Sequence, residues 1–557
     1  MQFSLRMLRA AALAAVLGTG LVACGDDTTA PPATPPAPTG LTATSQSATS
    51  VLVSWNAVTG ATSYTLERAD ASAPGVFAAI GGSIATTSYT DGATTAGVAY
   101  SYRVAAVNAS GTGTFSAAAS VTVPGAAVAT LSGNYTTDRT LSADTLYTLS
   151  GYVKFGGGST LTIPAGTTIV GDAAVLGSSL WILRGSQIDA QGTAAAPIVF
   201  TSSKPAGSRA PGDWGGIIII GNGVVNRSGT VLTEGPAGIT EPYSGGTDNA
   251  DNSGTLRYVR IEFAGYDVSG GAGQELNSLS MYAVGSGTTM EYVQSLAGLD
   301  DSFEWWGGAV DGRYLVSYEA GDDHFDWTEG YRGRNQFLIA FQSTRLTPAP
   351  NSGTQAVDPE GFEADGCNGT GCDLGFASVP YSVPVFANFT LVGPGTGTVL
   401  TGSGDLGMVL RRGTGGYLTN GIVARWQRQG LSVRDPETNT MMTTDSLNVS
   451  NLLLAENALN YDDDAGTNFG KAAAFAASNH VTSAATAASL FTSLTAASLD
   501  WTPAAGSPAA TGGGTVVIPP AYTGTYFGGS LTNTTYFGAA DPAGAKWWQG
   551  WTSYATN

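Results

Sequence analysis

The acidic residues of the C-terminal part recur at a fixed spacing. Segment 300–305 (DDSFEW) returns 22 residues later as segment 322–327 (DDHFDW), and segment 360–363 (EGFE) repeats the spacing of 323–326. If the chain winds in coils of this length, residues one period apart lie directly above one another and the carboxylates form columns. Like charges about 5 Å apart repel by roughly 0.8 kcal/mol in water and ~3 kcal/mol at an effective dielectric constant of 20.

Such columns need something that offsets the repulsion, and the sequence leaves three solutions open. A bound cation, shared protons with raised carboxyl pKa values, or basic partners would each do so. The basic residues available are Arg332, Arg334 and the stacked pair Arg411 and Arg434. Carboxylate oxygens in flexible geometry suit Ca²⁺, so one hypothesis is a Ca²⁺ site that stabilises the coils. The metal-ligand candidates are Asp300, Asp301, Glu304, Asp322, Asp323, Asp326, Glu360 and Glu363.

Two other readings of these acids compete with the metal site. One is a structural network of acids, arginines and waters, and the other is a carbohydrate-cleaving centre. Paired carboxylates can hydrolyse glycosides when they face each other across a cleft, whereas a lyase combines Ca²⁺ with a base. The catalytic candidates are Glu304, Asp326, Arg332 and Arg334, although no motif places the two arginines. The sequence leaves the question of catalysis open and favours binding over an enzyme.

Strand alternation predicts which way these side chains point. If Phe303, Phe325 and Phe362 form an internal aromatic ladder, the neighbouring acids point outward. The residues expected on this outer face are Glu304, Asp326, Glu363, Trp306 and His324.

An outer face of this kind suits a sugar. Exposed aromatic rings beside carboxylates can stack on sugar rings, and the dense aromatic residues of segments 305–306, 327–331 and 547–548 support this interpretation. The ligand-binding candidates are Trp306, Glu304, Asp326 and His324. His324 is expected to be a surface histidine whose pKa the neighbouring acids raise.

Further repeats extend the coils over residues 128–557. Leu161, Gly166 and Ile169 recur 19 residues later, Tyr292 recurs 22 residues later, and segment 408–411 returns at 431–434. Strand-like triplets with periods near 20 predict a solenoid of β coils, each rising about 4.8 Å. Segment 471–499 is expected to hold a short helix, and segment 547–551 (WWQGW) to cover the last coil.

Several stretches of this region match a known family. They are 196–201 (APIVFT), 212–216 (GDWGG), 274–277 (QELN), 301–308 (DSFEWWGG), 536–539 (YFGA) and 550–552 (GWT). With these stretches the region resembles a right-handed parallel β-helix of the pectate-lyase-like kind. More narrowly, it is similar to bacterial exported β-helix lipoproteins without assigned activity, so the resemblance implies a fold and supplies no catalytic residues.

Composition restricts the function further. The 557 residues include 77 glycines, and 42 acidic against 23 basic residues give a net charge of −19. A chain poor in charge and rich in glycine is typical of an all-β protein with many turns. The acidity argues against a nucleic-acid partner, because phosphates require a basic surface. Only two histidines are present, which largely excludes a histidine-built zinc site.

The first residues have the pattern of an export signal. Arg6 and Arg9 precede an apolar run that ends Leu-Val-Ala before Cys24. The pattern resembles a bacterial lipobox, which predicts a signal peptide over 1–23, acylation of Cys24 and a membrane anchor. Residues 24–38 form a Pro-rich tether. Because the acidic residue comes at Asp26 and not directly after Cys24, we expect the outer membrane, facing either the periplasm or the surface.

The two remaining cysteines form a local pair. Cys367 and Cys372 lie in a glycine-rich loop, 366–372 (GCNGTGC). An even pair in an exported protein predicts a disulfide that staples the loop.

Residues 39–124 have short alternating strands. Trp55, the pair Tyr64 and Leu66, and segment 100–111 resemble a fibronectin type III domain. The predicted fold is therefore all-β, a small Ig-like fibronectin type III sandwich followed by a large right-handed parallel β-helix over 128–557.

These features together predict a surface-anchored lipoprotein whose β-helix binds polysaccharide or another extracellular ligand, such as a surface protein. The alternatives are a polysaccharide lyase or glycoside hydrolase on the same scaffold, and a structural envelope or adhesion protein. The sequence does not determine the oligomeric state.

Overall fold

The computed structural model describes residues 33–557 except 48–49, 126, 271–272, 357–358, 396–404, 462–479, 517, 519–521 and 523. The chain divides into two compact units, one up to Gly125 and one from Ala126 to Asn557. The predicted signal peptide 1–23, Cys24 and the predicted tether as far as residue 32 lie outside the described residues. No helix in the described part of the chain is long and apolar enough to cross a membrane.

The N-terminal unit is a sandwich of two antiparallel sheets. One sheet contains β1 (Thr42–Ser47), β2 (Ser50–Ser54) and β5 (Ser88–Asp91). The other contains β3 (Ser63–Asp70), β4 (Ala78–Ile84), β6 (Ala99–Asn108), β7 (Gly111–Thr112) and β8 (Ala119–Thr122). Alternate residues of β2 and β3 are buried, and the rings of Trp55 and Tyr64 meet edge to face at 5.4 Å in the core. The predicted sandwich is confirmed, with Trp55, Tyr64 and Leu66 in its core.

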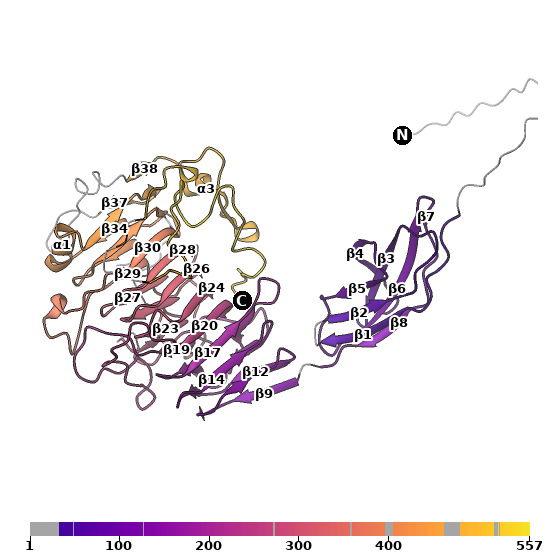
Figure 1. Cartoon of the computed structure of the whole chain (residues 1–557), viewed down its shortest axis with the longest axis horizontal. Coiled ribbons are helices and arrows are strands. Elements are labelled where there is room, and N and C mark those ends of the chain that lie inside the picture. The colour runs from indigo at the N-terminus through magenta and orange to yellow at the C-terminus, as the bar shows by residue number, and fades with distance from the viewer. Residues whose placement is uncertain are drawn as a thin grey trace, which may run out of the picture. The chain divides into compact units, whose positions relative to one another are not determined.

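The C-terminal unit is a parallel β-helix, in which successive coils add strands to two long sheets (Figure 1). The first sheet, called here the acidic sheet, contains β10 (Asn134–Tyr135), β13 (Tyr152–Phe155), β16 (Ser179–Ile182), β19 (Ile217–Ile220), β23 (Leu279–Tyr282), β25 (Phe303–Trp306), β27 (Phe325–Thr328), β29 (Glu360–Ala364), β31 (Leu406–Leu410), β34 (Gln429–Val433) and β37 (Leu459–Tyr461).

The second sheet bends around the other faces of the coils. It contains β9 (Ala127–Leu131), β11 (Arg139–Thr140), β12 (Thr145–Leu149), β14 (Thr160–Ile163), β15 (Thr168–Gly171), β17 (Gln187–Gln191), β18 (Ile198–Ser202), β20 (Gly254–Glu262), β24 (Thr289–Leu296), β26 (Asp311–Tyr318), β28 (Arg334–Phe341), β30 (Val385–Val392), β32 (Gly416–Thr419), β33 (Ile422–Ala424), β35 (Leu447–Ser450), β36 (Leu453–Ala455) and β38 (Val481–Ser483). Its pairings between successive coils are parallel, as in the acidic sheet.

The strand register tests the predicted repeats. Phe303 lies beside Phe325, Val293 beside Leu315, and Leu410 beside Val433, so the offsets of 22 and 23 are confirmed. The offset of 19 is wrong. Leu161 pairs with Ile188, and Ile169 pairs with Phe200, because the early coils are longer than the apparent sequence repeat. The number of residues per coil varies because the loops that connect the strands differ in length.

The bend in the second sheet carries a column of residues with positive φ. Tyr258, Tyr292, Tyr314 and Phe337 have φ between 49° and 64°, and their rings stack 4.3–5.2 Å apart. A bulky residue with positive φ is strained, and the repeated stacking on neighbouring coils compensates for it.

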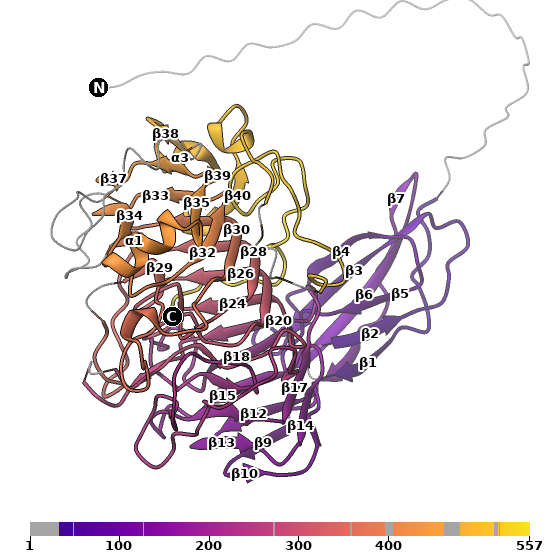
Figure 2. The same ribbon diagram turned by 60° about the vertical axis from the view of Figure 1, so that its left-hand side comes forward.

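The C-terminal segment runs back along this column and does not cover the last coil. Trp551 meets Tyr258 and Tyr292 edge to face, and Trp547 packs on Tyr314. Figures 1 and 2 both show the yellow end of the chain beside β24 to β28. The predicted cap is therefore wrong, since these tryptophans cover the side of the middle coils.

Short elements complete the unit. They are the hairpins β21 (Tyr266–Asp267) with β22 (Glu275–Leu276) and β39 (Phe491–Ser493) with β40 (Asp500–Pro503), the helices α1 (Pro436–Thr443) and α3 (Ala487–Leu490), and the 3-10 turns η1 (Gly375–Ala377), η2 (Ala496–Ser498) and η3 (Pro508–Ala510). Within the predicted helical segment 471–499, residues 471–479 lie outside the described residues, and the helix present is the four-residue α3.

Candidate functional site: an acidic column and an adjoining pocket

The acids predicted to stack do stack. In the acidic sheet Glu304 lies beside Asp326, and Asp326 lies beside Glu363. On the preceding turn, the backbone N–H of Asp323 donates to Asp301 Oδ1 over 2.8 Å, and the N–H of Glu360 donates to Asp323 Oδ1 over 2.5 Å. We call these eight residues the acidic column: Asp300, Asp301, Glu304, Asp322, Asp323, Asp326, Glu360 and Glu363.

The aromatic ladder lies inside the coils, as expected. Phe303, Phe325 and Phe362 are fully buried, with ring centroids 5.3 and 5.7 Å apart between neighbours. Trp305 and Trp327, two residues further along their strands, are buried in the same core. Strand alternation therefore sends Glu304, Asp326 and Glu363 to the outer face of the sheet, whereas Asp301 and Asp323 precede their strands.

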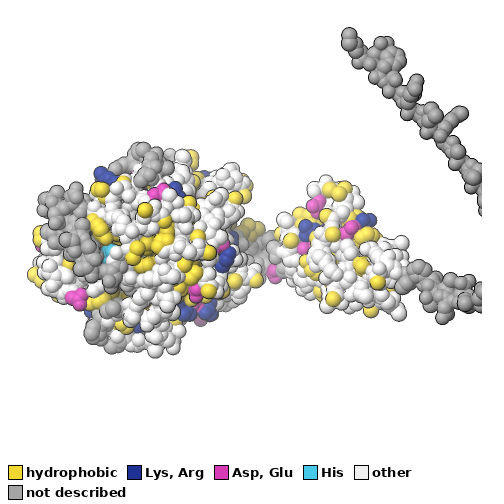
Figure 3. All heavy atoms as spheres, turned by 90° about the horizontal axis from the view of Figure 1, so that it is seen from above, with side chains coloured by type: hydrophobic (Ala, Val, Ile, Leu, Met, Phe, Trp, Pro, Cys, Tyr) yellow, Lys and Arg dark blue, Asp and Glu magenta, His cyan; other side chains and the backbone are white. Residues whose placement is uncertain are grey.

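This outer face is covered, which corrects the prediction of an exposed site. Trp306 belongs to a second apolar cluster outside the sheet, formed with Val225, Val231 and Tyr243 from the segment between β19 and β20. The exposed fractions of Asp301, Glu304 and Asp326 are 5, 8 and 9%. Figure 3 shows one face of the molecule, on which the acidic side chains (magenta) are few and scattered. The aromatic residues expected to be exposed are buried as well, apart from the half-buried Trp547.

The predicted surface histidine is also wrong. His324 is 1% exposed, its Nδ1 lies 2.5 Å from Ser317 Oγ, and its ring meets Trp426. Burial disfavours the charged imidazolium and lowers the pKa of His324 to about 3. His324 is therefore neutral at physiological pH and cannot bind a ligand at the surface.

Burial and mutual repulsion shift the carboxyl groups in the opposite direction. Burial is the main cause that raises the pKa values, and neighbouring carboxylates add to it. The column residues with raised pKa values are Asp300, Asp301, Glu304, Asp323 and Asp326.

Three triads of these acids have metal-ligand spacing. In each triad one carboxylate oxygen per residue lies within 4.8 Å of the others. The triads are Asp300, Asp301 and Asp322; Asp301, Asp323 and Asp326; and Asp323, Glu360 and Glu363. Asp323 Oδ2 is buried and accepts no hydrogen bond from the described residues, whereas Asp326 is hydrogen-bonded to the carboxyl group of Glu304. An unpaired buried carboxylate oxygen is costly, so the donor set fits a hard cation such as Ca²⁺.

Arg411 supplies a positive charge at the last coil of the column. Its guanidinium pairs with Glu363 and, over 2.9 Å, with Asp365. Arg434, predicted to stack with it, donates to Ser432 Oγ over 3.3 Å. The expected basic partner is thus present at Glu363, and the charge of Arg411 also acts on Asp323 and Asp326.

Arg332 and Arg334 lie elsewhere. Arg334 is in β28 of the second sheet and pairs with Asp311 in β26. Both arginines line a cavity of about 260 Å³ together with Asp311 and Tyr522. The structure does not bring them together with Glu304 and Asp326, so the four catalytic candidates do not form one centre.

A polar pocket opens beside the column. It has a volume of about 270 Å³, and Trp306 is the predicted ligand-binding residue that reaches it. We call it the Trp306 pocket; its lining includes Arg227, Leu232, Glu234, Tyr243, Gln274, Tyr282, Trp306 and Thr370. The rings of Tyr282 and Trp306 stack at 4.0 Å, and Tyr243 packs on Tyr282 at 4.8 Å.

Charge in this pocket is balanced. Arg227 Nη1 lies 2.7 Å from Glu329 Oε1, and the Tyr243 hydroxyl donates to Glu329 Oε2 over 2.5 Å. Glu234 is half-buried, and burial together with the charges of Glu275 and Glu329 raises its pKa. The negative potential of the column extends to the pocket, because Glu234 also raises the pKa values of Asp300 and Glu304.

Sequence reasoning missed most of this pocket. Arg227, Glu234 and Tyr243 come from the long segment between β19 and β20, which has no repeat to align it. One signal was available: Ile217–Ile220 is a continuous apolar strand, buried on both faces, which indicates that its outer side is covered.

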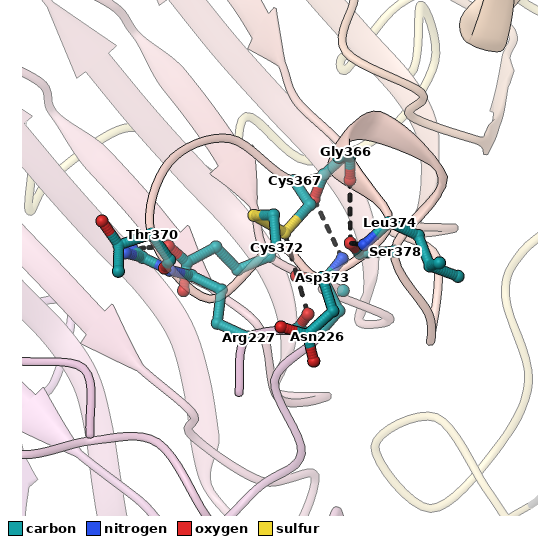
Figure 4. The surroundings of a disulfide bond; sticks show 12 residues. Asn226, Arg227, Gly366, Cys367, Thr370, Cys372, Asp373, Leu374 and Ser378 are labelled. Carbon is teal, nitrogen blue, oxygen red and sulfur yellow. Dashed lines mark hydrogen bonds and ion pairs between the residues drawn. A yellow bond between two sulfur atoms is a disulfide. The ribbon is translucent and has the colours of Figure 1, made fainter. Parts of the chain in front are cut away.

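The predicted disulfide is present (Figure 4), and Thr370 of the loop that it closes lines the pocket. Cys367 and Cys372 close a loop that holds the chain at 226–228. Asn226 Nδ2 donates to the carbonyl of Gly366 over 3.1 Å, and Arg227 Nε donates to that of Thr370 over 2.7 Å. The disulfide loop therefore helps to position Arg227 in the pocket.

The family of the larger unit follows from a family model. The model described as "Pectate-lyase like beta helix domain" matches residues 133–503. The chain belongs to this family. The fibronectin type III domain model matches residues 36–122.

Matches to individual proteins cover a small part of the chain. A poly(3-hydroxybutyrate) depolymerase of Ralstonia pickettii is 42% identical over 102 residues, which is 18% of this chain and 19% of the relative. The chain thus spans about a fifth of the length of this curated relative.

Solved structures match a similar share of the chain. An Fn3-like protein from Clostridium thermocellum is 34% identical and covers 16% of this chain and 96% of its own, with a TM-score of 0.16. The structure named FN3tt mut is 22% identical over 16% of this chain and 99% of its own, with a TM-score of 0.15.

Proposed function

We propose that the β-helix unit binds a neutral, hydroxyl-rich glycan in the Trp306 pocket. The observation that carries this proposal is an open polar cavity of about 270 Å³ lined by aromatic rings, a guanidinium and a carboxyl group with a raised pKa. A concave site with a few convergent polar groups and a perturbed ionisable group is the usual form of a ligand site.

The charges of the pocket select the class of glycan. The positive charge of Arg227 is matched by Glu329, and the raised pKa of Glu234 favours a neutral carboxyl group that can donate a hydrogen bond. The nearby Asp300 and Glu304 add no positive charge that would attract an anionic ligand. A neutral sugar suits this pocket better than a uronate.

The acidic column is proposed to hold Ca²⁺ that stabilises the coils. Its triads offer only oxygen ligands, and Asp323 presents a buried oxygen that accepts no hydrogen bond from the described residues. Calcium accepts six to eight oxygen ligands in flexible geometry, so backbone carbonyls and water complete such a site. The cation is structural in this proposal, because the column is buried.

The anchor proposed for the protein is an acyl chain on Cys24 at the bacterial outer membrane. The Pro-rich tether and the fibronectin type III domain then act as spacers that hold the β-helix away from the lipid. Metabolic labelling with a palmitate analogue, compared between the full chain and Cys24→Ser, tests the anchor.

Glycan binding is tested on an array of neutral and uronate-containing polysaccharides with the purified chain. We expect binding to neutral glycans, retention of that binding in Glu234→Gln, whose neutral amide also donates a hydrogen bond, and its loss in Glu234→Ala, which removes the polar group. Glu437→Gln, on helix α1, is the matched control. Failure of the chain to bind neutral glycans, or equal binding by Glu234→Ala, contradicts the proposal.

An enzymatic role is the second candidate, favoured by one observation. Glu234 and Glu304 are neighbouring carboxyl groups with raised pKa values, and one of them is half-buried beside the pocket. A pair of this kind can act as acid and base in glycoside hydrolysis. New reducing ends released from a bound glycan, and lost in Glu234→Gln, would support catalysis.

A further inference from the structure

A second cavity lies at the other sheet of the β-helix. Its volume is about 260 Å³, and it shares no lining residue with the Trp306 pocket. We call it the Arg332 cavity; its lining includes Asn249, Ser286, Asp311, Arg332 and Arg334. Asp311 begins β26 and Arg334 begins β28, so the cavity opens where two neighbouring strands of the second sheet start. A cavity of this size suits a ligand smaller than a drug-sized molecule.

Asp311 and Arg334 satisfy each other. Asp311 Oδ1 accepts the backbone N–H of Arg334 over 2.9 Å and its Nε–H over 3.0 Å, and Oδ2 pairs with Nη2. The guanidinium also donates to the carbonyls of Gly524 and Thr525, over 3.2 and 3.3 Å. The carboxylate of the cavity is therefore occupied by Arg334, and Arg334 acts on a ligand mainly through its charge.

Three other side chains leave hydrogen-bond donors for a ligand. Arg332 Nε donates to the carbonyl of Tyr381 over 3.3 Å, and its guanidinium forms no ion pair with the described residues. Asn249 Oδ1 accepts the backbone N–H of Val224 over 2.8 Å, so Nδ2 is the group of this amide that can serve a ligand. The side chain of Ser286 is exposed, and its hydroxyl can donate. A ligand that fits these groups must supply acceptors.

The charge of the cavity favours an anion with a single negative charge. Arg332 and Arg334 bring two positive charges and Asp311 one negative charge, which leaves an excess of one positive charge. This excess stands out in a chain whose net charge is −19. A dianion would be repelled more strongly by the carboxylate of Asp311 than a monoanion.

The remaining walls suit a short carbon chain. Ala250 and Ala309 line the cavity together with Tyr522, whose hydroxyl donates to the carbonyl of Val383. These residues add apolar surface beside the donors. A planar guanidinium matches the two oxygens of a carboxylate, which is the monoanion that a carbon chain most commonly carries.

We propose that the Arg332 cavity binds a small monocarboxylate. Its carboxylate group accepts hydrogen bonds from Arg332, Asn249 and Ser286, and its carbon chain lies against Ala250 and Ala309. This site is separate from the Trp306 pocket and from the acidic column, so it stands or falls independently of the proposed glycan and cation binding.

Calorimetric titration of the purified full chain tests the inference with propionate as the probe. Propionamide has the same shape without the charge, and we expect it to bind roughly tenfold more weakly or less. Sulfate, a dianion, should also bind more weakly than propionate, and added salt should lower the affinity for propionate. No binding of propionate, or equal binding of propionamide, would overturn the site; tighter binding of sulfate would overturn the assignment to a monocarboxylate.

A matched pair of arginine variants locates the binding. Arg332→Gln removes the charge and keeps an amide donor, and we expect it to lose roughly tenfold in affinity for propionate or more. Arg139→Gln, on β11, is the control and should bind as the unaltered chain does. Equal affinities of the two variants would show that Arg332 does not hold the carboxylate.

A second variant keeps the test valid if Arg332→Gln does not fold. Ser286→Ala changes an exposed side chain, so the fold should tolerate it. We expect it to bind propionate roughly fivefold more weakly, because one donor to the carboxylate is lost. An unchanged affinity would overturn the proposed set of donors.

Discussion

Calcium in the acidic column is expected to raise the thermal stability of the β-helix unit by an amount that can be worked out. Each ion at a free concentration of 100 times its Kd stabilises the folded chain by about 2.7 kcal/mol. Unfolding entropy is about 2.1 cal/mol/K per residue, or roughly 0.9 kcal/mol/K for the ~430 residues after Gly125. One ion therefore raises Tm by about 3 °C and two ions by about 6 °C.

The perturbation is the substitution of Asp301, which belongs to two of the three metal-spaced triads. Asp301→Asn keeps the oxygen that accepts the N–H of Asp323, and it removes one negative charge from the column. The repulsion between carboxylates on successive coils is roughly 3.5 kcal/mol at 4.8 Å and an effective dielectric constant of 20. We therefore expect the metal-free variant to have a higher Tm than the metal-free unaltered chain, and to show almost no response to Ca²⁺.

The assay is calorimetry of the full chain with excess Ca²⁺ and with a chelator. Glu437→Gln on helix α1 serves as the matched control, and it should keep the full Ca²⁺ response. Mg²⁺ at the same concentration should give a smaller shift, since it gives up its hydration water reluctantly. A Tm that is the same in Ca²⁺ and in chelator would refute the cation-filled column.

The remaining predictions concern pH, the disulfide and the C-terminal segment. The pKa values of the buried acids are raised in the folded chain, so the metal-free chain binds more protons when folded than when unfolded. Its free energy of unfolding should therefore rise as the pH falls from those raised values toward ~4. A pH series of denaturant midpoints measures this trend. The double variant Cys367→Ser, Cys372→Ser should lose more affinity for the glycan than free energy of unfolding, because the disulfide loop positions Arg227. Binding isotherms and melting curves of the same variant measure the two effects. Trp551→Ala should cost about 3–5 kcal/mol in denaturant unfolding, since this ring is fully buried against Tyr258 and Tyr292; an unchanged midpoint would contradict that packing.

The core of the β-helix was predictable where a short motif repeats. Segment 300–305 returns at 322–327, and the spacing of 323–326 returns at 360–363, so the register of Phe303, Phe325 and Phe362 followed from the motif even though the second of these coils is longer than the first. The pairing in the earlier coils does not follow the repeat counted in the sequence. Leu161 pairs with Ile188 and not with a residue 19 further on, because loops of unequal length separate strands of similar composition.

The sequence alone determined that the acids stack, that phenylalanine rings fill the interior beneath them, and that Cys367 and Cys372 pair, since these depend on short spacings. Only the tertiary structure decided that the column is buried. Strand alternation gives the side of a sheet on which a residue lies, whereas exposure depends on which other segments pack on that side. Here the segment between β19 and β20 covers Trp306 and forms the adjoining pocket, a contact between residues far apart in the chain that no local pattern encodes.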